Sequence, residues 1–214
     1  MSTKNTHARG PRARRRTWVA GGALLLLSVA VGIAARGQLA SFAPAKDWVF
    51  AAAMILLVVG MGRAGSLTAR RIVGTAAAIL LVTVPLTQSY WFSFIPDSTE
   101  DPHLAEDVGA FIAFTYHGIM AILAVITVVE IARAKVIPSP WRWAPLWVAV
   151  LTPITYAIGL TLFSSAPLGT TLASTGAIVA GYGPAVGIAL LGVLGIALGM
   201  REKATRDDAP AEFG

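Results

Sequence analysis

The sequence predicts an all-α, polytopic membrane protein with six transmembrane helices and both termini in the cytoplasm. First, 56% of its 214 residues are hydrophobic and 13% are charged, whereas about 25% charged residues is usual for soluble domains. Second, the apolar residues fall in long runs separated by short polar segments. Third, the basic residues gather in alternate connecting segments, which is typical of a chain that crosses a bilayer repeatedly.

The expected membrane domain covers residues 18–200, between a disordered basic tail at 1–17 and a cytoplasmic C-terminal tail at 201–214. The first apolar run, of about 18 residues, exceeds the apolar part of a signal peptide, and no A-x-A site follows it, so we expect an uncleaved span. The second run is short for a core of about 30 Å, so it should either begin earlier, near Ala43, or thin the bilayer locally. The six expected spans lie near 18–35, 48–61, 72–94, 108–132, 144–163 and 174–200.

Basic residues set the predicted orientation. Fifteen of the 17 Lys and Arg residues fall in the two tails and after the second and fourth spans, while the other connecting segments contain Arg36 and Lys46. The positive-inside rule then places both termini in the cytoplasm of a bacterial inner (plasma) membrane and requires an even number of spans. Among these basic residues, Arg133 should pair with Glu130, one helical turn earlier. Because the cations alternate with apolar runs instead of forming one polar face, we expect no nucleic-acid partner.

Prolines and glycines predict irregular or closely packed positions within the spans. Pro85 should kink the third span, Pro145 suits a first helical turn, and Pro153 lies in mid-span. The sequence GYGP at 181–184 predicts a break in the sixth span. Small residues four apart in that span favour close helix packing within the chain, at Gly183, Gly187, Gly195 and Gly199.

The segment 94–118 concentrates six side chains with acid or imidazole chemistry between Asp97 and Asp107. Its carboxylates and imidazole are suitable ligands for a divalent cation, but no EF-hand or HExxH spacing is present. Asp101 before Pro102 fits a helix N-cap and a first-turn proline, and acids there complement the helix dipole. We therefore expect no metal site and no cofactor. The titratable residues are Asp97, Glu100, Asp101, His103, Glu106 and Asp107.

Aromatic residues flank this acidic segment, and two interpretations remain open. Desolvation would raise the pKa of carboxylic acids at the mouth of an aromatic-lined pocket, so that they could protonate a lipid or isoprenoid. Alternatively, the aromatic rings form a belt at the membrane interface, together with Trp48, Trp141, Trp143 and Trp147. The flanking residues are Tyr90, Trp91, Phe92, Phe94, Phe111, Phe114 and Tyr116.

His117 is the most informative single residue, because it lies about nine residues inside the fourth span, roughly 13 Å below the outer boundary. Tyr156 and Tyr182 fall at a similar depth on the fifth and sixth spans. Together with Gln88, these side chains would form the floor of an outward-facing pocket. The alternative is a neutral His117 that hydrogen-bonds a neighbouring helix.

The primary functional prediction is an inner-membrane protein that binds an apolar or amphipathic ligand in an outward-facing, aromatic-lined pocket, as a carrier or a subunit of a membrane complex. Its expected binding residues are Gln88, Tyr90, Trp91, Phe114, Tyr116, Tyr156 and Tyr182. Expected partners are membrane lipids, an apolar small molecule, and either another membrane protein or a second copy of the chain.

Two further functions remain open. One is an intramembrane enzyme acting on a lipid or isoprenoid, and the other is a non-catalytic scaffold. The chain has no cysteine and no Walker, GxSG or paired-histidine haem motif, which removes several enzyme classes. In an enzyme, the acid or base would be His117 or one of the carboxylates Asp97, Glu100, Asp101, Glu106 and Asp107.

Overall fold

The structure, a computed structural model, describes residues 9–36, 40–61, 66–69, 71–96, 102–137, 139, 141–167 and 169–207. Every regular element in these ranges is helical, so the all-α prediction is confirmed. The elements are α1 (Arg9–Ala34), η1 (Ala40–Phe42), α2 (Ala43–Val59), α3 (Ile72–Thr83), η2 (Val84–Thr87), α4 (Gln88–Phe92), α5 (Pro102–Ala134), η3 (Trp141–Trp143), α6 (Ala144–Ser165) and α7 (Thr171–Asp207).

Within the described residues, five helical segments are long and apolar enough to cross a membrane. They cover Ala13–Ala34, Ile72–Phe92, His103–Ala134, Trp141–Ser165 and Thr171–Arg201. The remaining long helix, α2, has 17 residues, or about 26 Å at 1.5 Å per residue, slightly less than the hydrocarbon core. It begins at Ala43, as its length required. These helices are those of a multi-pass membrane protein.

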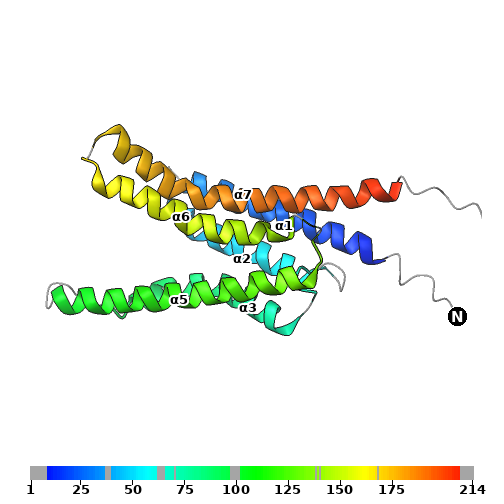
Figure 1. Cartoon of the computed structure of the whole chain (residues 1–214), viewed down its shortest axis with the longest axis horizontal. Coiled ribbons are helices and arrows are strands. Elements are labelled where there is room, and N and C mark those ends of the chain that lie inside the picture. The colour runs from blue at the N-terminus through cyan, green and yellow to red at the C-terminus, as the bar shows by residue number, and fades with distance from the viewer. Residues whose placement is uncertain are drawn as a thin grey trace, which may run out of the picture.

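The helices form one elongated bundle in which α7 packs along both α6 and α1 (Figure 1). The order then continues from α1 to α2, from α2 to α3, and from α3 to α5. The start of α1 and the last turns of α7 lie at the same end, where Gly199 approaches Arg15 and Val19. We call this the terminal end, and we call the opposite end, where α6 ends and α7 begins, the distal end (Figure 1).

Helix α1 begins at Arg9, so residues 9–17 of the predicted tail are helical instead of disordered. Tertiary contacts explain the difference. Thr17 is buried, donates its hydroxyl proton to the Ala13 carbonyl at 2.9 Å and accepts the Met61 backbone N–H at 2.8 Å. Arg14 donates to the Val136 carbonyl at 3.0 Å. These bonds attach the first turns of α1 to two other segments of the chain.

The prolines act in three different ways. Pro85 converts the third span into α3, the 3₁₀ turn η2 and the short α4, so the predicted irregularity is confirmed. Pro145 lies in the first turn of α6, as expected. The predicted break at GYGP is wrong, because α7 continues through Pro184. A single proline removes one backbone hydrogen bond, and the helix changes direction along its length without ending (Figure 1).

The glycines of α7 pack within the chain, as predicted, and they face two different helices. Gly183 and Gly187 contact α6, whereas Gly195 and Gly199 contact α1. One close approach involves Gly22 of α1, where an added Cβ would lie 2.5 Å from the Gly192 carbonyl oxygen. Small residues therefore allow α7 to pack closely against α6 with its first half and against α1 with its second half.

Candidate functional site

A cavity of about 400 Å³ lies in the distal half of the bundle, between α1, α2, the η2 turn and α7. Its wall is mostly apolar and includes Val29, Phe50, Val82 and Ile188. Its volume is within the range of about 300–1,000 Å³ that is usual for small-molecule sites. The cavity therefore has the size and lining of a ligand site.

The two prolines that disturb the spans both border this cavity. Pro85 belongs to the η2 turn, and Pro184 lies on the wall contributed by α7. Neither residue has a backbone N–H, and each interrupts the regular hydrogen-bonding of its segment. Irregular backbone in a membrane protein is expected where it lines a cavity. The proline positions predicted from the sequence thus mark the site, although the GYGP segment is a continuous helix.

Arg36 follows the end of α1 and lies at the rim of the cavity. Its guanidinium carbon is 4.1 Å from the centre of the Tyr182 ring, which gives a cation–π contact. Its Nη2 donates to the Gly181 carbonyl oxygen. These two contacts hold the guanidinium against α7 at the cavity wall.

Two further charged side chains, Lys46 and Asp47, come from the first turns of α2 and line the same cavity. The aliphatic stem of Lys46 lies against Gly32, where an added Cβ would be 3.5 Å from the Lys46 Cδ. Among the described residues, no carboxylate oxygen lies within 4.0 Å of a nitrogen of Arg36 or Lys46. The rim therefore carries two cations, Arg36 and Lys46, and one anion, Asp47, which do not form ion pairs with one another.

A second hollow of about 490 Å³ adjoins the cavity and shares Ala43, Lys46, Asp47, Pro85 and Leu86 with it. It extends toward α4, where its wall includes the following side chains: Trp48, Gln88 and Phe92. The charged rim thus lies between an apolar interior and a more open, partly aromatic surface.

Two of the predicted binding residues lie at this site. Gln88 lines the second hollow, and Tyr182 supports Arg36. Tyr116 is buried against Trp91 and Phe92, with ring centres 6.2 and 6.0 Å away. Phe92 also lines the second hollow, so this aromatic cluster borders that hollow.

The other predicted binding residues lie elsewhere. Tyr90, Phe114 and Tyr156 are exposed on the protein surface, where membrane lipid would contact them. The cavity wall contains one aromatic residue, Phe50. The cavity is therefore lined by aliphatic side chains and charged groups, whereas the expected pocket was lined by aromatic rings.

His117 is exposed on α5, and its Nδ1 lies 2.7 Å from the Ala113 carbonyl oxygen of the same helix. It borders neither hollow. Glu106 and Asp107 are exposed near the start of α5, about 15 Å from His117 along the helix axis at 1.5 Å per residue. These two acids and His117 therefore cannot act on one bond. The remaining predicted acids, Asp97, Glu100 and Asp101, lie outside the described residues.

From the sequence, Arg36 and Lys46 were interpreted as topology markers, and their position at the cavity was not predicted. One signal was available, since they are the two cations predicted on the side of the membrane that is otherwise nearly free of them. A basic residue that departs from the positive-inside pattern is a functional candidate when it also borders a span.

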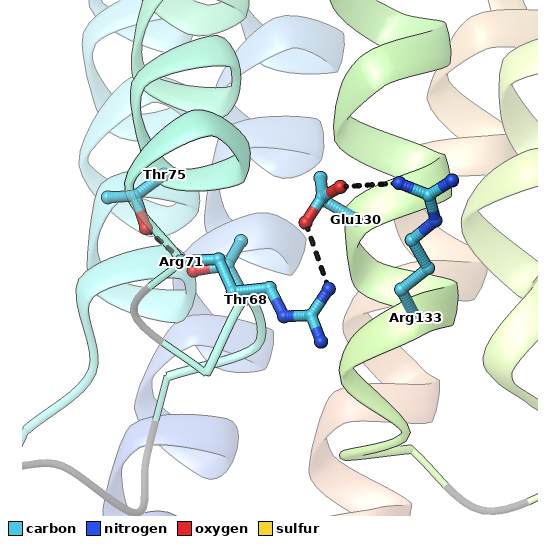
Figure 2. Close-up of polar contacts among 5 residues, drawn as sticks. All are labelled: Thr68, Arg71, Thr75, Glu130 and Arg133. Atoms are coloured by element: carbon cyan, nitrogen blue, oxygen red, sulfur yellow. Dashed lines mark hydrogen bonds and ion pairs between the residues drawn. The ribbon is translucent and has the colours of Figure 1, made fainter.

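A separate polar cluster lies at the terminal end (Figure 2). Glu130 accepts hydrogen bonds from Arg71 at 3.4 Å and from Arg133 at 3.2 Å, so its predicted pairing with Arg133 is confirmed. Beside it, the hydroxyls of Thr68 and Thr75 are 2.8 Å apart. The cluster joins the start of α3 to α5. In the described part of the chain, no group of three or more His, Cys, Asp or Glu side chains is placed to hold a metal ion.

No protein-family model, curated protein or solved structure matches the chain. The structure alone therefore defines the class of protein. Its helices are apolar enough to cross a membrane, and its distal half contains an apolar cavity with charged residues at the rim.

Proposed function

We propose that this protein binds an apolar or amphipathic ligand in the distal cavity, as a carrier or as the ligand-binding subunit of a membrane complex. The observation that carries the proposal is the cavity of about 400 Å³ enclosed by α1, α2, η2 and α7. Closely packed membrane proteins leave few voids of this size. An apolar void with charged groups at one end matches the two parts of an amphipathic molecule.

The proposed orientation has six spans and both termini in the cytoplasm of a bacterial inner membrane, so that the distal cavity opens toward the outer leaflet. The termini of α1 and α7 at one end support an even number of crossings. The terminal end carries Arg14, Arg71, Arg133 and Lys135, which fits the positive-inside rule. Cysteine accessibility to a membrane-impermeant maleimide tests this, with Ser41→Cys expected to react from outside and Lys135→Cys from inside.

Binding is tested by filling the cavity. Ala185 lines it, and Ala185→Phe should displace the ligand, whereas the next residue, Val186, is 67% exposed on the outside of α7 and provides the matched variant Val186→Phe. Mass spectrometry of detergent-purified protein measures co-purifying lipid per mole of protein. We expect Ala185→Phe to reduce the bound lipid at least tenfold and Val186→Phe to leave it unchanged. Equal occupancy in both variants and the wild type would exclude the cavity as the binding site.

A further inference from the structure

We infer that the ligand of the distal cavity is a single-chain amphiphile with an anionic headgroup, a carboxylate or a phosphate, which Arg36 and Lys46 hold at the rim. This inference rests on the proposed binding function and specifies the chemical class of the ligand. It depends on the charges at the rim and on the size of the cavity behind them.

The charges favour an anion. Both cations are exposed, and the described residues provide neither with a carboxylate within 4.0 Å, so their charges are accessible to an anionic group. Arg36 has five N–H donors, and one of them is directed to the Gly181 carbonyl while the Tyr182 face supports the group. The remaining donors can bind a carboxylate or phosphate through paired hydrogen bonds.

The two cations come from different helices and meet at the same rim. Arg36 follows α1, whereas Lys46 belongs to the first turns of α2. An anion between them would be contacted from both sides. Asp47 also borders the cavity and would repel a second negative charge, which favours a headgroup with a compact charge over one with several separated anionic groups.

The interior favours one acyl chain. The volume of about 400 Å³ is near the lower limit for small-molecule sites, which run from about 300 to 1,000 Å³. Val29, Phe50 and Ile188 supply apolar wall from three helices. The cavity volume is a better match to one acyl chain than to the two chains of a phospholipid, with the headgroup at the charged rim.

The test compares ligands that share a chain and differ in charge. Purified protein in lipid nanodiscs is titrated with 1-oleoyl-lysophosphatidate against 1-monoolein, and with oleate against methyl oleate, at pH 8 and low salt. We expect each anionic ligand to bind at least tenfold more tightly than its neutral counterpart. The phosphate and carboxylate pairs together show which anion is preferred.

Variants connect the preference to the rim. Arg36→Gln and Lys46→Gln should each reduce the anionic preference several-fold, while binding of the neutral ligand stays within about twofold. Lys135→Gln removes an exposed cation at the terminal end and should change neither ratio. Arg36→Lys retains the charge and shows whether a loss in Arg36→Gln comes from charge or from misfolding.

The outcomes separate the two proposals. If the neutral and anionic ligands bind equally well and Ala185→Phe abolishes both, the cavity binds ligand but the inference on the headgroup is wrong. If no ligand binds in a manner sensitive to Ala185→Phe, the proposed function itself fails. A preference for anions that persists in Arg36→Gln and Lys46→Gln would also overturn the inference.

Discussion

The carboxylate of Glu130 on α5 bonds to Arg71 at the start of α3, with an Oε2–Nη1 distance of 3.4 Å. The Glu130 side chain is 12% exposed, whereas Arg71 is 49% exposed and Arg133 is 66% exposed. Glu130 therefore occupies the interior of this cluster, and its two arginines approach it from outside (Figure 2).

Replacing Glu130 should destabilise the protein more than replacing one of its partners. Glu130→Ala removes the acceptor of two charged hydrogen bonds, so we expect a loss of about 1–2 kcal/mol. Arg133→Ala removes one solvent-screened pair and should cost about 0.5 kcal/mol or less. Unfolding in mixed dodecylmaltoside and dodecylsulfate micelles measures both values. Equal losses would contradict the interior position assigned to Glu130.

The close packing of α1 and α7 should tolerate no added methyl group at Gly22. Its Cβ would lie 2.5 Å from the Gly192 carbonyl and 2.9 Å from Ile196 Cγ1, so Gly22→Ala should cost about 1–3 kcal/mol through overpacking. Gly118 on α5 is the matched control, because no atom lies within 4 Å of an added Cβ. Gly118→Ala should be neutral or stabilise the helix by about 0.5–1 kcal/mol. The same micellar unfolding assay compares the two variants.

Two buried threonines should respond in opposite ways to replacement by valine. Thr127 is 3% exposed, and its hydroxyl has no hydrogen-bond partner among the described residues. Thr127→Val should therefore be neutral or stabilise the protein by up to about 1 kcal/mol. Thr68 bonds to Ser66 and Thr75 at 3.1 and 2.8 Å, so Thr68→Val should cost about 1–3 kcal/mol. Thermal unfolding of the purified variants shows whether each replacement raises or lowers the stability of the protein.

His117→Ala distinguishes the sequence-based site from the cavity. The sequence argument predicts loss of binding, whereas the structure places His117 outside both hollows. On the structural argument, the variant should bind 1-oleoyl-lysophosphatidate within about twofold of wild type, since no wall residue changes. Isothermal titration in nanodiscs measures this ratio. A tenfold loss of binding with a normal yield of folded protein would instead place the binding site at His117 on α5.

The helices were predictable because a span must be a long apolar run to cross the bilayer. Within the bilayer, it must also satisfy its own backbone hydrogen-bonding groups, which a helix does. The start of α2 at Ala43 and the turn at Pro85 followed from the same reasoning. The start of α1 at Arg9 did not, since Thr17 is fixed by the backbone of Met61, in the segment that follows α2. Such a contact leaves no local pattern in the sequence.

The candidate site was less predictable than the helices. The depth of His117 could be counted along one span, but its direction depends on how α5 is rotated, and a helix that is apolar on all sides does not encode that rotation. The convergence of Arg36 and Lys46 depends on the lateral order of α1, α2 and α7, which hydropathy does not specify. The prolines were better predictors of the site than His117, because a proline acts on the backbone of its own segment.

The two-sided glycine surface of α7 also bears on how the protein is made. α1 is synthesised before α7, yet its long glycine-lined contact is with α7. Domains assemble as their segments become available during synthesis. The face of α1 around Gly22 must therefore remain in lipid, or against an insertion factor, until α7 has been translated, and the α1–α7 contact closes only after α7 is inserted.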